Sequence, residues 1–290
     1  MSVTAEDIRS AATALQGHII RTPMLAAPML SRQLGCDLFV KLECQQYTSS
    51  FKARGAYIAM QSLNAAQRKA GVIAMSAGNH AQAVAYHAER MGIPAVIVMP
   101  AQTPFAKVAR TRAYGAKVVL EGRNLNECEG TVNTLIDERG LTLIHPYDNA
   151  LVMTGQGTVG LEMLEDEPDL DILVVPIGGG GLIGGIATIA REMRPNIKII
   201  GVQTEAYPTM QLAIAGKEIE CGGETLAEGI AVKKPGNVTR PVVAQLVDDI
   251  ILVSERQLEW AVGALVEQQR VVAEGAGAAG IAAIYGNPAL

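Results

Sequence analysis

The sequence has 290 residues, is 49% hydrophobic and carries a formal net charge of −5. Such a length supports a large core, and two lobes are expected. The mild acidity gives no basic footprint for nucleic acid or an anionic membrane surface, and no apolar run approaches the ~20 residues that cross a bilayer. The start has no signal-peptide pattern and the four cysteines form no CxxC pair, so a cytoplasmic protein with reduced thiols is expected: Cys36, Cys44, Cys128 and Cys221.

Short β-branched runs alternate with longer helix-like segments along the chain. The runs that predict strands are residues 71–75, 95–99, 116–120, 141–145, 171–175, 197–202 and 249–253. Apolar runs without polar alternation suit strands that are buried on both faces, and strand–helix alternation predicts an α/β fold with parallel sheets flanked by helices. We expect residues 49–140 to form a small lobe inserted into a large lobe made of residues 1–48 and 141–290.

The stretch SSFKARGAY, residues 49–57, places Lys52 directly after Phe51 and among small residues. No acidic residue stands four positions away on either side, so Lys52 lacks the usual partner of a solvated helix lysine. Tight, weakly polar surroundings disfavour the ammonium form, so the pKa of Lys52 should fall and its neutral amine should be a nucleophile. The alternative is a structural lysine whose stem lies along a lobe edge.

A glycine-rich stretch follows the run at 171–175 and is made of Gly178, Gly179, Gly180, Gly181 and Leu182. Glycines allow backbone N–H groups to point at an anion, and the positive end of a following helix adds to the attraction. No GK[ST] follows, so this is not a Walker loop, and a small phosphorylated cofactor is expected. The alternative is a tight turn with close helix packing.

A dinucleotide site is a second possibility for the same stretch. Gly179, Gly181 and Gly184 satisfy GxGxxG, and Glu205 follows about 20 residues later, as the ribose-binding acid of that fingerprint does. This interpretation leaves Lys52 and the next motif unexplained, so we favour the phosphorylated cofactor over NAD.

The motif SAGNHAQ, residues 76–82, follows the predicted strand at 71–75. A short polar turn of this kind can present N–H and hydroxyl groups to a carboxylate, and the Asn79 side chain can bond a ring substituent. The alternatives are a helix cap for Asn79 and a packed histidine bonded to the backbone for His80. A reactive lysine, a phosphate cup and a carboxylate-binding turn together predict pyridoxal 5'-phosphate held as a Schiff base.

Five motifs carry a resemblance to a known family from about Arg21 to Gly280: SSFKARGA, SAGNHAQ, GQGTVGLE, PIGGGGLIGG and EGIAVKKPG. The sequence resembles the fold-type II pyridoxal phosphate enzymes, which are like the β subunit of tryptophan synthase. Within them it is most similar to the threonine/serine dehydratases (ammonia-lyases) and to serine racemase. The resemblance implies two α/β lobes with the cofactor between them.

The resemblance also implies residue roles. Lys52 would be the catalytic Schiff-base lysine, which also removes the Cα proton. The residues implied to bind the cofactor are Phe51, Lys52, Asn79, Gly178, Gly179, Gly180, Gly181, Leu182, Gly229 and Glu274. The residues implied to hold the substrate carboxylate are Ser76, Ala77, Asn79 and His80.

The implied reaction is β-elimination from L-threonine or L-serine, which gives 2-oxobutyrate or pyruvate and ammonia. The alternatives are a hydroxyaspartate-type dehydratase, a serine racemase, or a pyridoxal phosphate-binding protein without activity because its C-terminus is incomplete. A small hydroxy amino acid is the expected partner, and a homodimer is the expected assembly.

Three positions depart from the pattern of the family. Ala77 stands where serine racemase has a serine as its second base, so efficient racemisation is not expected. Gln203, Tyr207 and Thr209 stand at the offsets where metal-binding relatives place a divalent site, so no metal is expected. The chain stops at Leu290, before the strand that supplies the pyridine-nitrogen partner in relatives, and we expect a longer natural form in which the helix at 275–286 packs in the large lobe.

Overall fold

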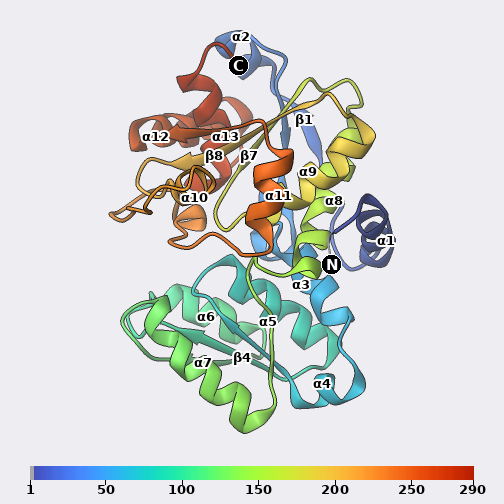
Figure 1. The fold of residues 1–290 in the computed structure, drawn as a ribbon, viewed down its shortest axis with the longest axis vertical. Coiled ribbons are helices and arrows are strands. Elements are labelled where there is room, and N and C mark those ends of the chain that lie inside the picture. Colours follow the sequence, from blue (N-terminus) through green and yellow to red (C-terminus); the bar gives the residue numbers. More distant parts are fainter. Residues whose placement is uncertain (1–2) are drawn as a thin grey trace.

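The computed structural model describes residues 3–290, whose helices and strands are drawn in Figure 1. The strands are β1 (Met24–Ala26), β2 (Phe39–Lys41), β3 (Val72–Met75), β4 (Ala95–Met99), β5 (Lys117–Leu120), β6 (Thr142–Leu143), β7 (Ile172–Pro176), β8 (Lys198–Thr204) and β9 (Asp249–Val253). The first seven α-helices are α1 (Ala5–Leu15), α2 (Pro28–Leu34), α3 (Lys52–Gln61), α4 (Ala65–Ala70), α5 (Asn79–Met91), α6 (Phe105–Ala113) and α7 (Leu125–Arg139). The others are α8 (Ala150–Asp166), α9 (Gly181–Met193), α10 (Thr209–Ile214), α11 (Thr239–Leu246), α12 (Glu255–Ala264) and α13 (Gly275–Gly286). Short helical turns lie at η1 (Glu43–Gln45), η2 (Tyr47–Ser49), η3 (Glu228–Ile230) and η4 (Leu265–Gln269).

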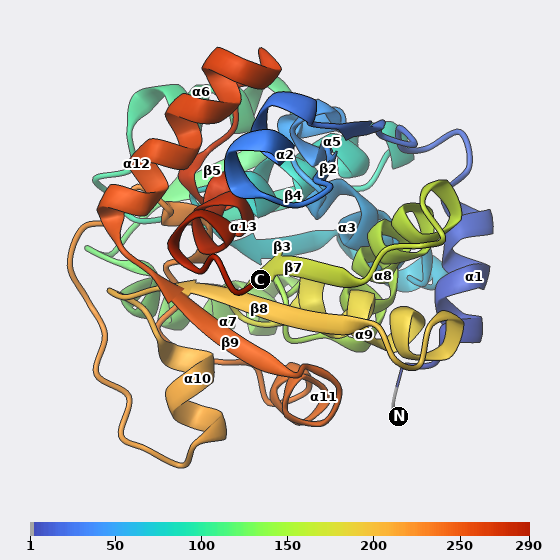
Figure 2. The same cartoon turned by 90° about the horizontal axis from the view of Figure 1, so that it is seen from above.

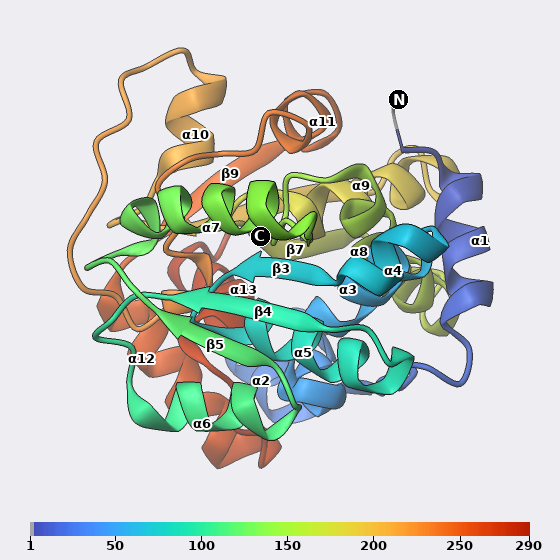
Figure 3. The same cartoon turned by 90° about the horizontal axis from the view of Figure 1, so that it is seen from below.

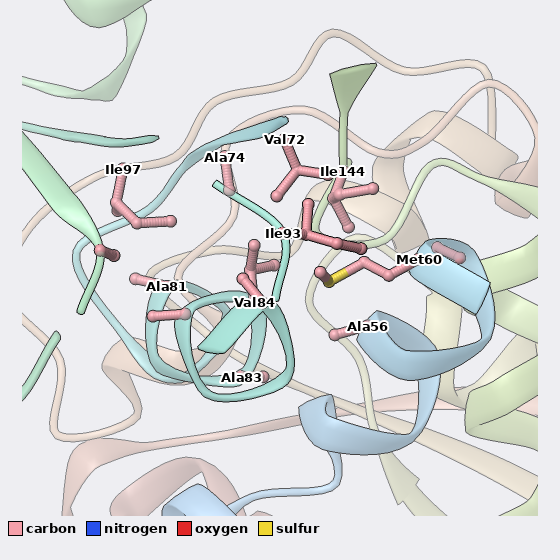
Figure 4. Packing of buried hydrophobic residues seen from close by; sticks show 14 of the residues in the cluster. Ala56, Met60, Val72, Ala74, Ala81, Ala83, Val84, Ile93, Ile97 and Ile144 are labelled. Atoms are coloured by element: carbon pink, nitrogen blue, oxygen red, sulfur yellow. The ribbon is translucent and has the colours of Figure 1, made fainter. Parts of the chain in front are cut away.

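The first large sheet has four parallel strands in the order β5-β4-β3-β6. Figure 3 shows α7 on one face of this sheet and α5 with α6 on the other. Val72 and Ala74 pack in the cluster with α5, whereas Ile73 between them packs in the cluster with α7. Figure 4 shows the first cluster, in which Met60 of α3 joins the side chains of the sheet and α5. The strands are therefore buried on both faces, which explains their unbroken apolar runs.

The second large sheet has three parallel strands in the order β7-β8-β9 (Figure 2). Ile199 of β8 packs in a cluster with side chains of α8 and α9, whereas Val202 of the same strand packs with α12 and α13. Helices therefore cover both faces of this sheet too. The seven predicted strands are confirmed as strands, and the predicted α/β class with parallel sheets is confirmed with them.

The strands β1 and β2 were not apparent in the sequence pattern. They form a separate antiparallel pair, in which Met24 lies opposite Lys41. β6 pairs with β3, so the four-stranded sheet extends to residue 143, beyond the limit of 140 that we predicted for the inserted segment. The division into a small and a large lobe with those limits stays a proposal.

The carboxyl ends of β3 and β7 lead directly into the two motifs of interest. The turn after β3 ends where α5 begins at Asn79, and the glycine-rich loop after β7 ends where α9 begins at Gly181. Parallel α/β sheets bind their ligands at such strand ends. The predicted helix at 275–286 is α13, which packs against α12 and β9. None of the described helices is long and apolar enough to cross a membrane.

Candidate active site

Lys52 is the first residue of α3, and Phe51 is its N-cap. Its Nζ donates a hydrogen bond of 2.7 Å to the carbonyl oxygen of Pro146 and lies 5.3 Å from the centre of the Phe51 ring. Lys52 is absent from the ion pairs of the described residues. Burial without a negative partner lowers the pKa of Lys52 from its usual 10.5 to about 8. The predicted fall in pKa is confirmed, and a substantial share of this amine is neutral at mildly alkaline pH.

A buried charge cluster holds the start of α3 in place. The guanidinium of Arg54 is fully buried and donates to the carboxylates of Glu43 and Glu162. Lys41 Nζ lies 2.7 Å from the same Glu162 carboxylate. Buried charges are costly unless each one is paired, so removal of any one partner should destabilise the start of the helix that carries Lys52. Sequence patterns did not predict the cluster, because the partners are far apart along the chain.

The glycine-rich loop is anchored through its carbonyl groups and leaves its N–H groups free. The Gly179 carbonyl accepts from Thr239 Oγ1 and from the Gly236 N–H. Among residues 3–290, the N–H groups of Gly178 through Leu182 have no hydrogen-bond acceptor, although three of these residues are buried. Buried donors without partners are rare in proteins, so they indicate a place for an anion. The N-terminus of α9 begins at the same point and favours negative charge.

Gly180 has a positive φ of 94°, and a Cβ at that position would lie 2.7 Å from Met210 Cε and 2.8 Å from Thr239 Oγ1. Only glycine fits there without strain or displacement. The loop therefore fits the phosphate of a small cofactor, as predicted, and has more donors than a simple turn would use.

The segment that follows β6 closes the floor of this loop. A Cβ at Gly179 would strike the ring of Tyr147, and Tyr147 itself donates its hydroxyl to the Lys234 carbonyl. Asp148 accepts from the N–H groups of Asn237 and Val238. The sequence interpretation missed this contribution. The available signal was the polar string HPYDN, residues 145–149, directly after a predicted strand.

The turn after β3 is held by side-chain contacts. Ser76 Oγ accepts from the Gly78 N–H, and Asn79 Nδ2 donates 3.0 Å to Glu274 Oε2. A Cβ at Gly229 would lie 3.7 Å from the same Glu274 oxygen. Three of the predicted cofactor-binding residues therefore lie together. The alternative of a helix cap for Asn79 is wrong, because Gly78 is the N-cap of α5 and no side-chain cap bond is present.

His80 has the geometry of its alternative interpretation, a packed histidine bonded to the backbone. Its Nε2 lies 2.8 Å from the Ile144 carbonyl oxygen, and its Nδ1 has no partner among the described residues. Burial, with a smaller effect from the charge of Lys52, lowers the pKa of His80 to about 3. The ring is therefore neutral near pH 7, and its Nε2 must carry the proton because a carbonyl can only accept.

The other predicted site residues pack on the cores of the two large sheets or lie near Gly229. Phe51 and Leu182 pack together with the core beneath β7, and Ala77 packs on the core of the four-stranded sheet. A Cβ at Gly178 would lie 3.6 Å from the carbonyl oxygen of Gly229. Gly178, Gly229, Glu274 and Asn79 thus form one connected set, from the glycine-rich loop to the turn after β3.

The positions of the metal site of some relatives are occupied by neutral hydrogen-bonding groups. Gln203 Oε1 accepts from the N–H groups of Met210 and Gln211, and Thr209 Oγ1 donates to the Val232 carbonyl. These contacts hold the start of α10. Among residues 3–290 no three His, Cys, Asp or Glu side chains gather where they could hold a metal ion.

A buried lysine with a lowered pKa, free N–H groups at a helix N-terminus and a polar turn at another strand end are features expected of a pyridoxal phosphate site. The chain belongs to this class: residues 15–289 match the family of pyridoxal-phosphate dependent enzymes. The predictions of family and cofactor are confirmed, and the NAD alternative is not supported.

Within this family, the chain is similar to several individual proteins of known name. The chain is 45% identical over 284 residues to an L-threonine ammonia-lyase of Thermotoga maritima, and the match covers 97% of this chain and 71% of the relative. It is 44% identical to a catabolic L-threonine dehydratase of Staphylococcus aureus, with 97% and 82% covered. Among solved structures, maize serine racemase matches with a TM-score of 0.94 and 36% identity, over 98% of this chain and 87% of the other. A threonine deaminase from T.th. matches with a TM-score of 0.93 and 36% identity, over 99% and 94%.

Proposed function

We propose that this chain is an ammonia-lyase that converts L-threonine to 2-oxobutyrate and ammonia, and L-serine to pyruvate and ammonia. The observation that carries the proposal is that the amine of Lys52, whose pKa is lowered to about 8, bonds Pro146, the neighbour of the Tyr147 whose ring lies against the glycine-rich loop. The names of the relatives at 44–45% identity support the same reaction. The residue roles below are part of the proposal.

When bound, pyridoxal phosphate supplies an electron sink for the negative charge that develops at the substrate Cα. Lys52 would hold the cofactor and then take up the Cα proton, because a neutral amine is both a nucleophile and a base. The N–H groups of Gly178 through Leu182 would bind the phosphate. The side chain of Asn79 would bond the ring oxygen, with Glu274 and Gly229 beside it at the ring edge.

The substrate carboxylate would lie on the turn after β3. Ser76 supplies a hydroxyl, and the N–H groups of Asn79 and His80 in the first turn of α5 favour an anion. Because His80 is neutral and bonded to Ile144, its ring would position the turn and would not supply charge. Binding the carboxylate and the amine together fixes the direction of the Cα–H bond, which is what selective proton removal requires.

Racemisation is the second candidate, because maize serine racemase is among the structural matches. A racemase needs a proton donor on the second face of Cα. Ala77, at the position implied for that group, has no titratable atom. We therefore expect dehydration to exceed formation of the D-isomer by a wide margin. Hydroxyaspartate is a further candidate substrate for the same chemistry, since no residue of the turn distinguishes a methyl group from a carboxylate on Cβ.

The test is a panel of L-threonine, L-serine, D-serine and 3-hydroxyaspartate, scored for 2-oxo acid, ammonia and the D-isomer. The proposal expects the highest kcat/KM for L-threonine or L-serine, with little D-serine. No oxo acid from either L-amino acid would contradict it. Release from hydroxyaspartate alone would move the assignment to that substrate.

We also propose a cytoplasmic location and a homodimeric assembly. The four cysteines are free thiols in the structure, which fits a reducing compartment. Closed two-fold dimers are the commonest assembly of soluble oligomers. Light scattering on the purified holoenzyme tests the assembly, and a mass that corresponds to one chain would contradict it.

A further inference from the structure

The turn formed by residues 144–148, between β6 and α8, contacts two parts of the candidate active site. Its Pro146 carbonyl oxygen accepts a hydrogen bond of 2.7 Å from Lys52 Nζ. Its Tyr147 ring lies so close to Gly179 that a Cβ on that glycine would strike the ring. A change in the shape of this turn would therefore be felt both at the lysine amine and at the glycine-rich loop.

The side chain of His145 closes this turn. Its Nδ1 accepts from the N–H groups of Asp148, at 2.8 Å, and of Tyr147, at 3.3 Å. Neither N–H group has another acceptor among residues 3–290. Pro146 has a fixed φ and no N–H group, and a residue that precedes proline is held extended, which favours a turn at this point. Asn and Asp close turns in the same way, by accepting from the N–H group two residues further on.

The two N–H donors at Nδ1 fix the protonation of the His145 ring. Because a backbone N–H group can only donate, Nδ1 carries no proton, and the neutral ring has its proton on Nε2. The ring also meets the ring of Tyr147 edge-on, with centres 4.7 Å apart. A proton on Nδ1 would turn the acceptor into a donor, and both hydrogen bonds would be lost. The turn therefore requires an uncharged His145.

The groups around His145 keep its ring neutral near pH 7. Burial has the largest effect and lowers the pKa of His145 below its usual 6.5, the carboxylate of Asp148 opposes this, and the charge of Lys52 adds to it. His80, which faces the same turn, is neutral, and burial raises the pKa of the Tyr147 phenol, so neither adds charge near neutral pH. Since the folded chain holds the ring neutral, the turn should be intact above pH 6.5 and lost as the pH falls through the lowered pKa.

We propose that His145 is a positioning residue of the active site: as the acceptor that closes the turn at 144–148, it holds the Pro146 carbonyl at Lys52 and the Tyr147 ring at the glycine-rich loop. The inference rests on the proposed function, because both contacts lie where pyridoxal phosphate would bind. Protonation of Nδ1 releases both contacts together, so the affinity for the cofactor falls in acid.

Two substitutions separate the acceptor from the bulk of the ring. His145→Phe keeps an aromatic ring beside Tyr147 and has no acceptor, whereas His145→Asn can place an amide oxygen where Nδ1 lies. The cofactor is removed from the holoenzyme, and pyridoxal phosphate is titrated back at mildly alkaline pH while the Schiff-base absorbance is followed. His145→Phe should weaken binding about tenfold, because two backbone donors lose their acceptor, and His145→Asn should bind within about threefold of the unaltered enzyme.

The pH profile of the same titration distinguishes this role from a purely structural one. The amide of Asn does not titrate, so the affinity should fall more steeply on acidification in the unaltered enzyme than in His145→Asn. The ratio of the two affinities should change at least about threefold between about pH 8 and about pH 5, since a group that must be neutral costs up to about tenfold for each pH unit below its pKa. Parallel profiles would overturn the proposal that protonation of this ring releases the turn.

Nitrogen-15 NMR of the histidine-labelled protein reads the ring itself and depends neither on cofactor nor on turnover. The sequence has four histidines, and the signal that disappears in His145→Asn belongs to His145. We expect a ring with its proton on Nε2 at neutral pH, which takes up a second proton only below pH 6.5. A proton on Nδ1 at neutral pH would overturn the proposal, even if His145→Phe fails to fold.

His18→Phe is the matched control, because His18 is exposed, stacks on Tyr57 and takes no part in the turn. It should bind the cofactor as the unaltered enzyme does. Normal binding by the unaltered enzyme together with equal binding by His145→Phe would overturn this inference alone. Failure of the unaltered enzyme to bind the cofactor would overturn the proposed function, and this inference with it.

Discussion

The turn after β3 and the loop after β7 occupy equivalent places, at the carboxyl ends of parallel strands and at the start of a helix, but they are held in different ways. In the loop at 178–182 a carbonyl is anchored, and the N–H groups have no acceptor among the described residues. In the turn at 76–82 the side chains are already engaged: Asn79 bonds Glu274, and His80 bonds Ile144. In the proposed function the loop would therefore act as a preformed anion site, whereas the turn would exchange existing contacts for contacts with a ligand.

This difference has consequences for mutation. Damage to the loop should appear in cofactor affinity, because its geometry exists before binding. Damage to the turn should appear in turnover of the bound substrate, because its contacts form with the ligand. In the proposed function Lys52 holds the cofactor and acts on the substrate, so its loss should affect both.

The largest expected effect is that of Lys52→Ala. The variant loses the amine that would hold the cofactor and the base that would remove the Cα proton, so kcat should fall at least about 10⁴-fold. The fold should persist, because the Arg54 cluster that positions α3 is untouched. Steady-state release of 2-oxobutyrate measures kcat, and a circular dichroism spectrum shows whether the fold persists. Retention of more than about one hundredth of the activity would contradict the role, since general base catalysis alone contributes about 10²-fold or more.

The second prediction concerns pH and the cofactor-free protein. The pKa of Lys52 is about 8 in the folded protein and 10.5 ordinarily, so the unfolded chain binds more protons between these values. The buried ammonium destabilises the folded protein below pH 8, so the free energy of unfolding should rise as the pH rises from 8 to 10.5. The shift corresponds to roughly 3 kcal/mol. Denaturant unfolding of the unaltered protein and Lys52→Met should differ by this amount at pH 7 and converge near pH 10.5, whereas a constant difference would argue against the lowered pKa.

Gly180→Asp tests the loop. It adds a side chain where a Cβ would already lie 2.7 Å from Met210, and a like charge where the phosphate would bind. Cofactor affinity should fall about 100-fold, as expected for the loss of charge-assisted hydrogen bonds. Gly140→Asp is the matched control, since Gly140 has a positive φ of 63° and open space around it. If both variants bind the cofactor normally in titration, the loop does not hold the phosphate.

Asn79→Ala tests the turn and should have the smallest effect. The loss of one hydrogen bond that must re-form with the ligand should lower kcat about tenfold, with cofactor affinity changed less than in Gly180→Asp. Separate measurement of kcat and of cofactor affinity distinguishes the two loops. If Asn79→Ala loses cofactor affinity as severely as Gly180→Asp does, the turn and the loop do not differ in the way described.

The strands of the fold, Lys52 and the glycine-rich loop could be predicted from the sequence, each for a physical reason. Strands buried on both faces leave unbroken apolar runs, so their positions were predicted to within a few residues. Lys52 and the glycines were found because local composition alone makes them unusual. β1 and β2 were missed because three-residue strands leave no pattern.

Contacts over long sequence distances account for the other gaps. Two examples are Tyr147 under the glycine-rich loop and the carboxylates of Glu43 and Glu162 around Arg54, which depend on partners that only the folded chain brings near. For His80 the sequence left two interpretations open. The bond to Ile144 shows that its ring packs against the backbone, and the role of its N–H group toward the substrate carboxylate stays a proposal.

The central claim is that the amine of Lys52 holds the cofactor. The most direct measurement is reduction of the holoenzyme with borohydride, proteolysis and mass spectrometry of the peptides. The account predicts one pyridoxyl group per chain, on the peptide that contains Lys52, and no such label in Lys52→Ala. Label on any other lysine, or a fully active enzyme that carries none, would contradict it.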